Sequence, residues 1–252
     1  MAKRILVVED NDLNRKLFCD VLRSQGYAVE PCADGLEALD KARQFVPNLI
    51  ISDCDEVLLH MIVPFGQWLE ETQPVSFKLV GNDFGKAIRD KVTGEPVSPE
   101  EIWRLLGLFF DGEMHRQTPI AGAVGAINAL AEHADVVILT NLTDRHNEPR
   151  RQQLLAHGID FPVFTNQGPK GPALQAILDR YQPSKAIFID DLAQHHGSAM
   201  EHVPHIDRLH LCGEPSLAPH ITCGFEAGHA HARIDTWDHA LPWLLSRLEE
   251  NS

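Results

Sequence analysis

Short runs of aliphatic and β-branched residues alternate with amphipathic stretches along most of this chain. The apolar runs predict buried strands at 5–8, 28–29, 49–52, 136–139, 161–164, 185–189 and 208–211. Apolar residues at helical spacing predict helices at 11–25, 34–45, 123–134, 149–157, 170–181 and 237–248. Strands that alternate with helices in this way predict an α/β fold with a parallel sheet and right-handed crossovers.

One long stretch breaks this alternation. Residues 59–118 show helical periodicity without a convincing strand. Within it, Ser98-Pro-Glu-Glu marks the start of a helix, because proline and acidic residues are favoured in a first helical turn. We therefore expect a helical insertion after the strand at 49–52.

Composition narrows the classes of function. The 252 residues include 36 acidic and 22 basic side chains and have a net charge of -14. This acidic balance argues against general nucleic-acid binding, because such binding needs clustered Lys and Arg. The five cysteines form no C-x-x-C pair, which argues against a disulfide framework or a thiolate zinc site. No apolar run approaches the ~20 residues of a membrane span. We expect a cytoplasmic protein without a nucleic-acid or membrane partner.

Three predicted strands end in side chains that suit phosphate chemistry. These residues are Asp53 and Asp55, Thr140 and Asn141, and Asp190 and Asp191. Lys170 begins a predicted helix in the segment Gly168-Pro-Lys-Gly-Pro. Because ligands bind at the carboxyl ends of parallel strands, we expect one edge of the sheet to gather these side chains.

Four segments resemble, in order, the motifs of haloacid dehalogenase superfamily hydrolases. They are Asp53-Cys-Asp-Glu-Val-Leu, Val136-Val-Ile-Leu-Thr-Asn, Pro169-Lys-Gly-Pro-Ala-Leu and Ile187-Phe-Ile-Asp-Asp. One Asp-x-Asp alone is weak evidence, whereas four motifs in register are specific. The resemblance covers about residues 49–252 and implies a Rossmann-like, three-layer core around a parallel sheet.

The resemblance implies a phosphohydrolase that acts on a small phosphomonoester. Asp53 would attack phosphorus and form an aspartyl phosphate, which splits hydrolysis into two easier steps. Asp55 would serve as general acid and base, a contribution worth ~10²–10⁴-fold in rate. Thr140 and Asn141 would hold the phosphoryl oxygens, and Lys170 would offset their negative charge.

The implied cofactor is Mg²⁺, a hard cation that prefers oxygen ligands. The resemblance places it at Asp53, Asp55, Asp190 and Asp191, and without a cation these carboxylates would repel a phosphate. A dehalogenase is disfavoured, because those relatives do not need the acids at 190 and 191.

The resemblance also divides the chain into a core at 49–58 and 119–252 and a cap at 59–118. In this family such a cap is mobile, closes over the site and selects the substrate. Glu56 departs from the pattern, since many family members have glycine after the second aspartate. The local turn and the substrate preference are therefore in question at this position.

The first 53 residues resemble the front half of a two-component response-regulator receiver. The resemblance rests on Lys3-Arg-Ile-Leu-Val-Val-Glu-Asp-Asn and on Pro47-Asn-Leu-Ile-Ile-Ser-Asp. It implies a flavodoxin-like βαβα segment at 1–53 in which Glu9 and Asp10 bind Mg²⁺ and Asp53 accepts phosphate from a histidine kinase. The usual Met-Pro-x-Met-Asp-Gly continuation after that aspartate is absent.

The strand at 49–52 thus serves two family patterns that conflict. A strand has two edges, and in the phosphatase pattern the strands with the second and fourth motifs take both. We expect this arrangement, with residues 1–47 packed elsewhere, swapped onto another chain or partly mobile. A join at a shared aspartate indicates a chimera, of natural or artificial origin.

Two other functions remain open. One is a phosphoacceptor module in a two-component phosphorelay, and the other is a fused protein without turnover. An enzyme would release many equivalents of phosphate from p-nitrophenyl phosphate, whereas a receiver would take up one and keep it. The 14 histidines match no H-E-x-x-H or other zinc spacing.

Overall fold

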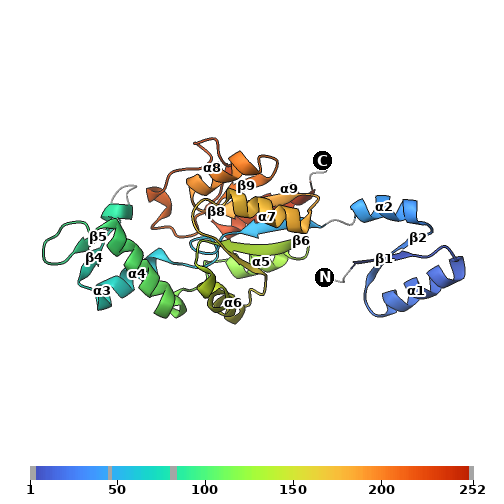
Figure 1. Ribbon diagram of the computed structural model, residues 1–252, viewed down its shortest axis with the longest axis horizontal. Helices are drawn as coiled ribbons and strands as arrows, with labels where there is room; N and C mark the ends of the chain where they lie inside the picture. Colours follow the sequence, from blue (N-terminus) through green and yellow to red (C-terminus); the bar gives the residue numbers. More distant parts are fainter. Residues whose placement is uncertain (1–3, 45–46, 80–83, 250–252) are drawn as a thin grey trace.

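The computed structural model describes residues 4–44, 47–79 and 84–249. Its main feature is a six-stranded parallel sheet in the order β10-β9-β8-β3-β6-β7 (Figure 1). The strands are β3 (Asn48–Ser52), β6 (Ala134–Thr140), β7 (Val163–Thr165), β8 (Ala186–Asp190), β9 (Asp207–His210) and β10 (Ala232–Arg233). The predicted α/β fold with a parallel sheet is confirmed.

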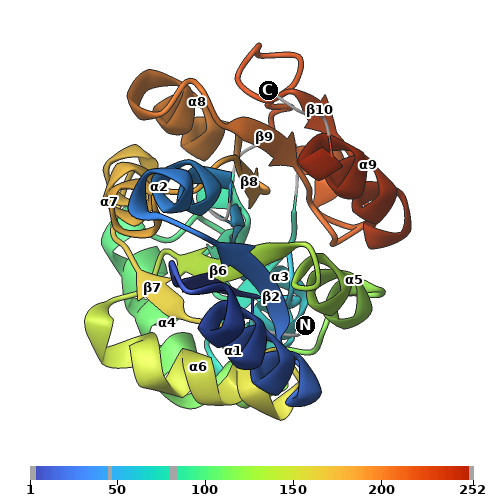
Figure 2. The same ribbon diagram turned by 90° about the vertical axis from the view of Figure 1, so that its right-hand side faces the viewer.

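Helices cover both faces of this sheet and produce three layers (Figure 2). On one face lie α5 (Ala123–Leu130) and α9 (Trp237–Glu249), and on the other lie α7 (Gly171–Tyr181) and α8 (Ala193–His202). The remaining core elements are α6 (Asn147–Ala156) and the 3-10 turns η3 (Asp144–His146) and η4 (Ala218–His220). In the described part of the chain, no helix combines the length and apolarity that a membrane crossing requires.

β3 is the central strand, with β8 on one edge and β6 on the other. Its side chains alternate between the two helical layers, as the geometry of a strand requires. Ile50 joins the α5–α9 layer, and Leu49 and Ile51 join the α7–α8 layer. All three are essentially fully buried, and burial of each stabilises the fold by ~1.5–3 kcal/mol. The strand order predicted for the phosphatase pattern is confirmed.

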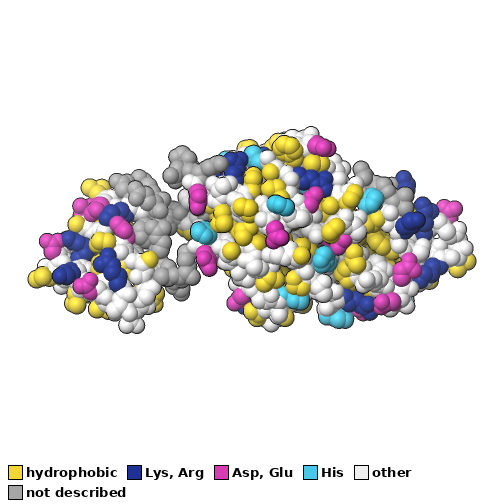
Figure 3. Space-filling view, turned by 180° about the vertical axis from the view of Figure 1, so that it is seen from behind, with side chains coloured by type: hydrophobic (Ala, Val, Ile, Leu, Met, Phe, Trp, Pro, Cys, Tyr) yellow, Lys and Arg dark blue, Asp and Glu magenta, His cyan; other side chains and the backbone are white. Residues whose placement is uncertain are grey.

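The N-terminal part forms a separate βαβα unit. It comprises β1 (Arg4–Val8), α1 (Asp12–Ser24), β2 (Ala28–Cys32) and α2 (Gly35–Gln44). β1 pairs with β2 in parallel and does not join the six-stranded sheet. Figure 1 shows the unit at one end of the molecule, and Figure 3 shows acidic and basic side chains interspersed over it.

Local sequence signals explain the helices of this unit, but its core is small. Asn11 accepts hydrogen bonds from two backbone amides and caps α1. Asp34 caps α2 in the same way. Cys19 and Cys32 are its buried apolar residues in the described part of the chain. A two-stranded sheet with so little burial is marginal on its own.

The insertion after β3 is only partly helical, which corrects the prediction of a helical cap without strands. Its helices α3 (Ile62–Thr72) and α4 (Pro99–Gly112) flank an antiparallel hairpin of β4 (Val75–Phe77) and β5 (Ile88–Asp90). The short turns are η1 (Phe84–Lys86) and η2 (Met114–Arg116). Strands of three residues are too short to display alternation in a sequence.

Aromatic rings form a separate core within the insertion. Phe65 meets Phe109 edge to face with 5.4 Å between ring centroids and stacks on Trp68 at 6.0 Å. Ser98 caps α4 by accepting a hydrogen bond from the Glu101 amide at 3.3 Å, which confirms the predicted helix start. The insertion therefore has its own apolar centre beside the sheet domain.

Candidate active site

Four of the predicted residues meet at the carboxyl ends of β3 and β8. Lys170 Nζ lies 2.7 Å from Asp53 Oδ1 and 2.7 Å from Asp190 Oδ2. Asp53, Asp190 and Asp191 each place a carboxylate oxygen within 4.8 Å of the others. The strands are parallel neighbours, so their carboxyl ends lie side by side. Lys170, the residue just before α7, supplies the ammonium.

Three carboxylates share this buried position with one ammonium. Burial raises the pKa of Asp53 to about 7 despite the attraction of Lys170. Burial and the neighbouring Asp190 raise the pKa of Asp191 well above its ordinary range. Burial opposes ionisation of Asp190 as well, but Lys170 lowers the pKa of that carboxyl. The all-oxygen donor set and the excess of negative charge suit a hard divalent cation such as Mg²⁺.

β6 brings Thr140 and Asn141 to the same edge of the sheet. Thr140 is fully buried, and its hydroxyl has no hydrogen-bond partner among the described residues. Asn141 donates from its side-chain amide to the Gly168 carbonyl at 2.9 Å and accepts from Asn166 at 2.8 Å. The Thr140 hydroxyl is therefore available for a ligand, whereas the Asn141 side chain fixes the loop that precedes Lys170.

Asp55 stands apart from the three clustered carboxylates. Arg150 on α6 donates from Nη2 to both carboxylate oxygens, at 2.9 and 3.0 Å, and Gln117 Nε2 donates to Oδ1 at 2.7 Å. The Arg150 side chain is fully buried. Sequence reasoning missed both partners, because they come from distant segments and no motif marks them. Asp55 is therefore held by Arg150 and Gln117, and its predicted contact with the metal is not part of this geometry.

Glu56 occupies the position where the family pattern favours glycine. Its φ of 62° lies in the left-handed region, which costs a residue with a Cβ ~1–2 kcal/mol. Its Oε1 accepts hydrogen bonds from the Met61 amide, at 2.9 Å, and from the Ile62 amide, and these bonds cap α3. Burial raises the pKa of Glu56 to about 8. The tight turn therefore persists without glycine, held by the side chain itself.

The acidic pair of the receiver pattern does not reach this site. Glu9 and Asp10 follow β1, which lies outside the sheet that carries Asp53. Glu9 Oε1 accepts a hydrogen bond from the Asn11 amide at 3.1 Å, and Asp10 is exposed. The metal site that the receiver resemblance implies is therefore not assembled in this chain.

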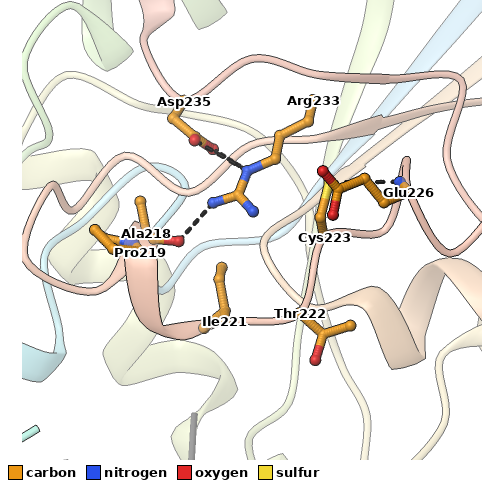
Figure 4. A pocket seen from close by; sticks show the side chains of 8 residues that line it. All are labelled: Ala218, Pro219, Ile221, Thr222, Cys223, Glu226, Arg233 and Asp235. Atoms are coloured by element: carbon orange, nitrogen blue, oxygen red, sulfur yellow. Dashed lines mark hydrogen bonds and ion pairs between the residues drawn. The ribbon is translucent and has the colours of Figure 1, made fainter. Parts of the chain in front are cut away.

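A hollow of about 590 Å³ lies away from the carboxylates, between η4 and β10 (Figure 4). Arg233 points into it and is held by Asp235 at 3.0 Å and by the Ala218 carbonyl at 2.6 Å. None of the predicted site residues lines this hollow. The Arg233 guanidinium is already paired, so it is not a free positive charge for a phosphate.

Solved structures resemble most of this chain. A haloacid dehalogenase-like hydrolase from Streptococcus pneumoniae aligns with a TM-score of 0.56 and 12% identity, over 79% of this chain and 99% of its own. Most of the chain has the haloacid dehalogenase-like fold. A family hydrolase from Deinococcus radiodurans, solved with bound phosphate and sodium, aligns at 0.56 and 14% over 81% and 97%. A predicted phosphoglycolate phosphatase from Haemophilus somnus aligns at 0.53 and 14% over 78% and 97%.

Curated relatives match a shorter part of the chain. The polar-differentiation response regulator DivK of Brucella ovis is 49% identical over 53 residues, which are 21% of this chain and 43% of the relative. DivK of Brucella melitensis matches equally well. This chain thus spans less than half the length of these relatives, consistent with a receiver-like segment joined to another fold. No protein-family model matches the chain.

Proposed function

We propose that this protein is a Mg²⁺-dependent phosphohydrolase that acts on a small phosphomonoester through a phosphorylated Asp53. The contact of Lys170 with both Asp53 and Asp190, beside Asp191 at the sheet edge, carries this proposal. It is supported by the fold, since structures that share it include a predicted phosphatase and a hydrolase with bound phosphate.

The chain's own groups suit a two-step transfer. An oxygen of Asp53 attacks phosphorus, and the bond to the leaving oxygen breaks while Asp55 supplies a proton to it. Asp55 then takes a proton from water, which attacks the aspartyl phosphate and releases inorganic phosphate. A protonated Asp55 keeps one oxygen for Arg150 and turns the other toward the leaving group.

The remaining groups bind and orient the phosphate. Lys170 holds Asp53 in place and offsets charge, and the Thr140 hydroxyl donates to a phosphoryl oxygen. Asn141 is proposed to contact the phosphate as well, within the limits set by its bonds to Gly168 and Asn166. Mg²⁺ held by Asp53, Asp190 and Asp191 would neutralise the charge that gathers during transfer.

We also propose that residues 59–118 are a cap that selects the substrate, on a core formed by 49–58 and 119–252. Contacts between insertion and core support this division. Asp111 at the end of α4 lies 2.7 Å from His146 Nε2, and Arg145 lies 2.9 Å from the same carboxyl. The boundary also has an apolar part, in which Ile62 of the insertion packs with Cys212 and Leu217 of the core.

Turnover of p-nitrophenyl phosphate tests this function. With Mg²⁺ present, we expect many equivalents of phosphate per chain, and removal of the metal with a chelator should abolish release. Uptake of a single equivalent that stays on the protein would support a phosphoacceptor module instead. That alternative lacks the receiver's metal site, because Glu9 and Asp10 follow β1, which lies outside the sheet whose strand β3 leads to Asp53.

A further inference from the structure

A second group of metal-ligating side chains lies next to the carboxylate cluster, and the proposed mechanism does not use it. Glu56, His60 and Glu214 each offer one ligand atom, and these atoms lie within 4.8 Å of one another. They come from the turn after β3, the start of the insertion and the loop after β9. The His60 side chain is 25% exposed, so an ion can enter from solvent.

Glu56 is a buried carboxylate in which one of the two oxygens accepts no hydrogen bond. The residue is 2% exposed, and its Oε1 already accepts from two backbone amides. Its Oε2 has no hydrogen-bond partner, and no ion pair joins Glu56 to a cation among the described residues. A proton on Oε2 would neutralise the charge but would itself find no acceptor. A cation would satisfy both the charge and the free oxygen.

Hydrogen bonds hold the side chains of His60 and Glu214 in place. His60 Nδ1 lies 2.7 Å from Glu214 Oε2, a hydrogen bond that needs one proton between the two atoms. Glu214 Oε1 accepts from the amide and the hydroxyl of Ser216, at 2.8 and 2.6 Å. Ligands held by outer partners in this way need little rearrangement when a metal ion replaces the shared proton.

We propose that Glu56, His60 and Glu214 bind a divalent transition-metal ion of the Zn²⁺ class. An imidazole nitrogen with two carboxylate oxygens suits such an ion, whereas Mg²⁺ favours the all-oxygen set at Asp53, Asp190 and Asp191. The two sets share no residue. Three protein ligands also leave a coordination position open for water or a substrate oxygen.

Calorimetric titration of the full chain with ZnCl₂, in excess Mg²⁺, tests the proposal. We expect a stoichiometry of one Zn²⁺ per chain. His60→Ala and Glu56→Gln should each weaken this binding at least about 100-fold, since loss of an outer partner alone costs 10–100-fold. Glu56→Gln keeps an oxygen for the Met61 and Ile62 amides, and circular dichroism checks that it folds.

Two further variants separate the possible outcomes. His115→Ala, an exposed histidine of the insertion outside the cluster, should leave Zn²⁺ binding unchanged. Asp190→Asn should lower phosphate release while Zn²⁺ still binds, so failure of the phosphohydrolase proposal is distinguishable from failure of this one. Absence of stoichiometric binding to the wild type overturns the proposal. So does binding that persists in His60→Ala and Glu56→Gln, or that is lost in Asp190→Asn.

Discussion

Arg150 is a fully buried guanidinium that depends on Asp55 for its charge partner. Asp55→Asn would leave this cation unpaired, and breaking a buried pair in this way costs ~3–5 kcal/mol. We expect a loss of that size in the free energy of unfolding measured with urea. Asp53→Asn is the matched control and should cost far less, because Lys170 keeps Asp190 as a partner. Equal stability of the two variants would contradict the assigned pairing.

Replacement of the Thr140 hydroxyl should affect stability and phosphate release in opposite directions. It is buried without a partner, a state that costs ~1–3 kcal/mol, and valine has nearly the same shape. Thr140→Val should therefore unfold at equal or higher urea concentration than the wild type. Phosphate release should fall by about 10²-fold, as when a donor to a developing charge is lost. Unchanged turnover would remove Thr140 from the site.

The predictability of the site from sequence differed between residues. Asp53, Asp190 and Asp191 were marked by motifs at strand ends. Lys170 was marked by a motif at a helix start, and all four converge as expected. Arg150 carried no local signal, because a buried arginine on α6 looks like any arginine of a surface helix. The position of Glu56 was flagged by its family pattern, but its bonds to α3 depend on packing that a sequence does not reveal.

Among the elements, α7 and α8 make the tightest contact near the site. A Cβ at Gly171, the first residue of α7, would lie 2.4 Å from the Ser198 carbonyl oxygen on α8. Gly171→Ala should therefore force the helices apart, cost ~1–3 kcal/mol and displace the adjacent Lys170, with reduced phosphate release. Gly107→Ala on α4 meets nothing within 4 Å and should stabilise the protein by ~0.5–1 kcal/mol. Equal urea midpoints for the two variants would contradict this packing.

Elements with strong periodicity were predictable, and short or polar ones were not. The strands β3, β6 and β8 appear as apolar runs in the sequence and form the buried centre of the sheet. The hairpin of β4 and β5 gave no signal, because its strands are three residues long. α8 was missed because Ala-Gln-His-His-Gly-Ser-Ala-Met-Glu-His shows too few apolar residues for a helical stripe.

At the scale of the whole molecule, a buried histidine makes stability depend on pH. His210 faces His196 on α8, Arg233 on β10 and Asp190 on β8. Burial, aided by the neighbouring His196 and Arg233, lowers the pKa of His210 to about 3. The folded state therefore excludes a proton that the unfolded state binds near its ordinary pKa of 6.5. This contribution is complete above pH 6.5 and is lost as the pH falls toward 3.

Urea unfolding between pH 7 and pH 5 measures this effect in the wild type and in His210→Gln. The wild type should lose roughly 2 kcal/mol relative to the variant over this interval. The raised pKa values of Asp53 and Glu56 act in the opposite direction, but they are present in both proteins and cancel in the difference. Parallel pH profiles for the two proteins would show that His210 titrates normally in the folded state.

The overall strand order could be predicted because two family patterns compete for the same strand. The strand at 48–52 cannot serve a receiver and a phosphatase at once, and the structure gives both of its edges to the phosphatase strands. The receiver-like unit is left with a two-stranded sheet and two buried cysteines. Its placement at one end of the molecule (Figure 1) was not predictable, because none of its described residues belongs to the hydrophobic clusters of the rest of the protein.

The account depends most on Asp53 as the nucleophile. Phosphate release with Mg²⁺ should therefore be measured for the wild type and for Asp53→Asn, both verified as folded by circular dichroism. We predict many turnovers for the wild type and a fall of roughly 10⁶-fold, into the background, for the variant, as when a covalent nucleophile is removed elsewhere. Release of phosphate by Asp53→Asn at a rate near that of the wild type would contradict the account.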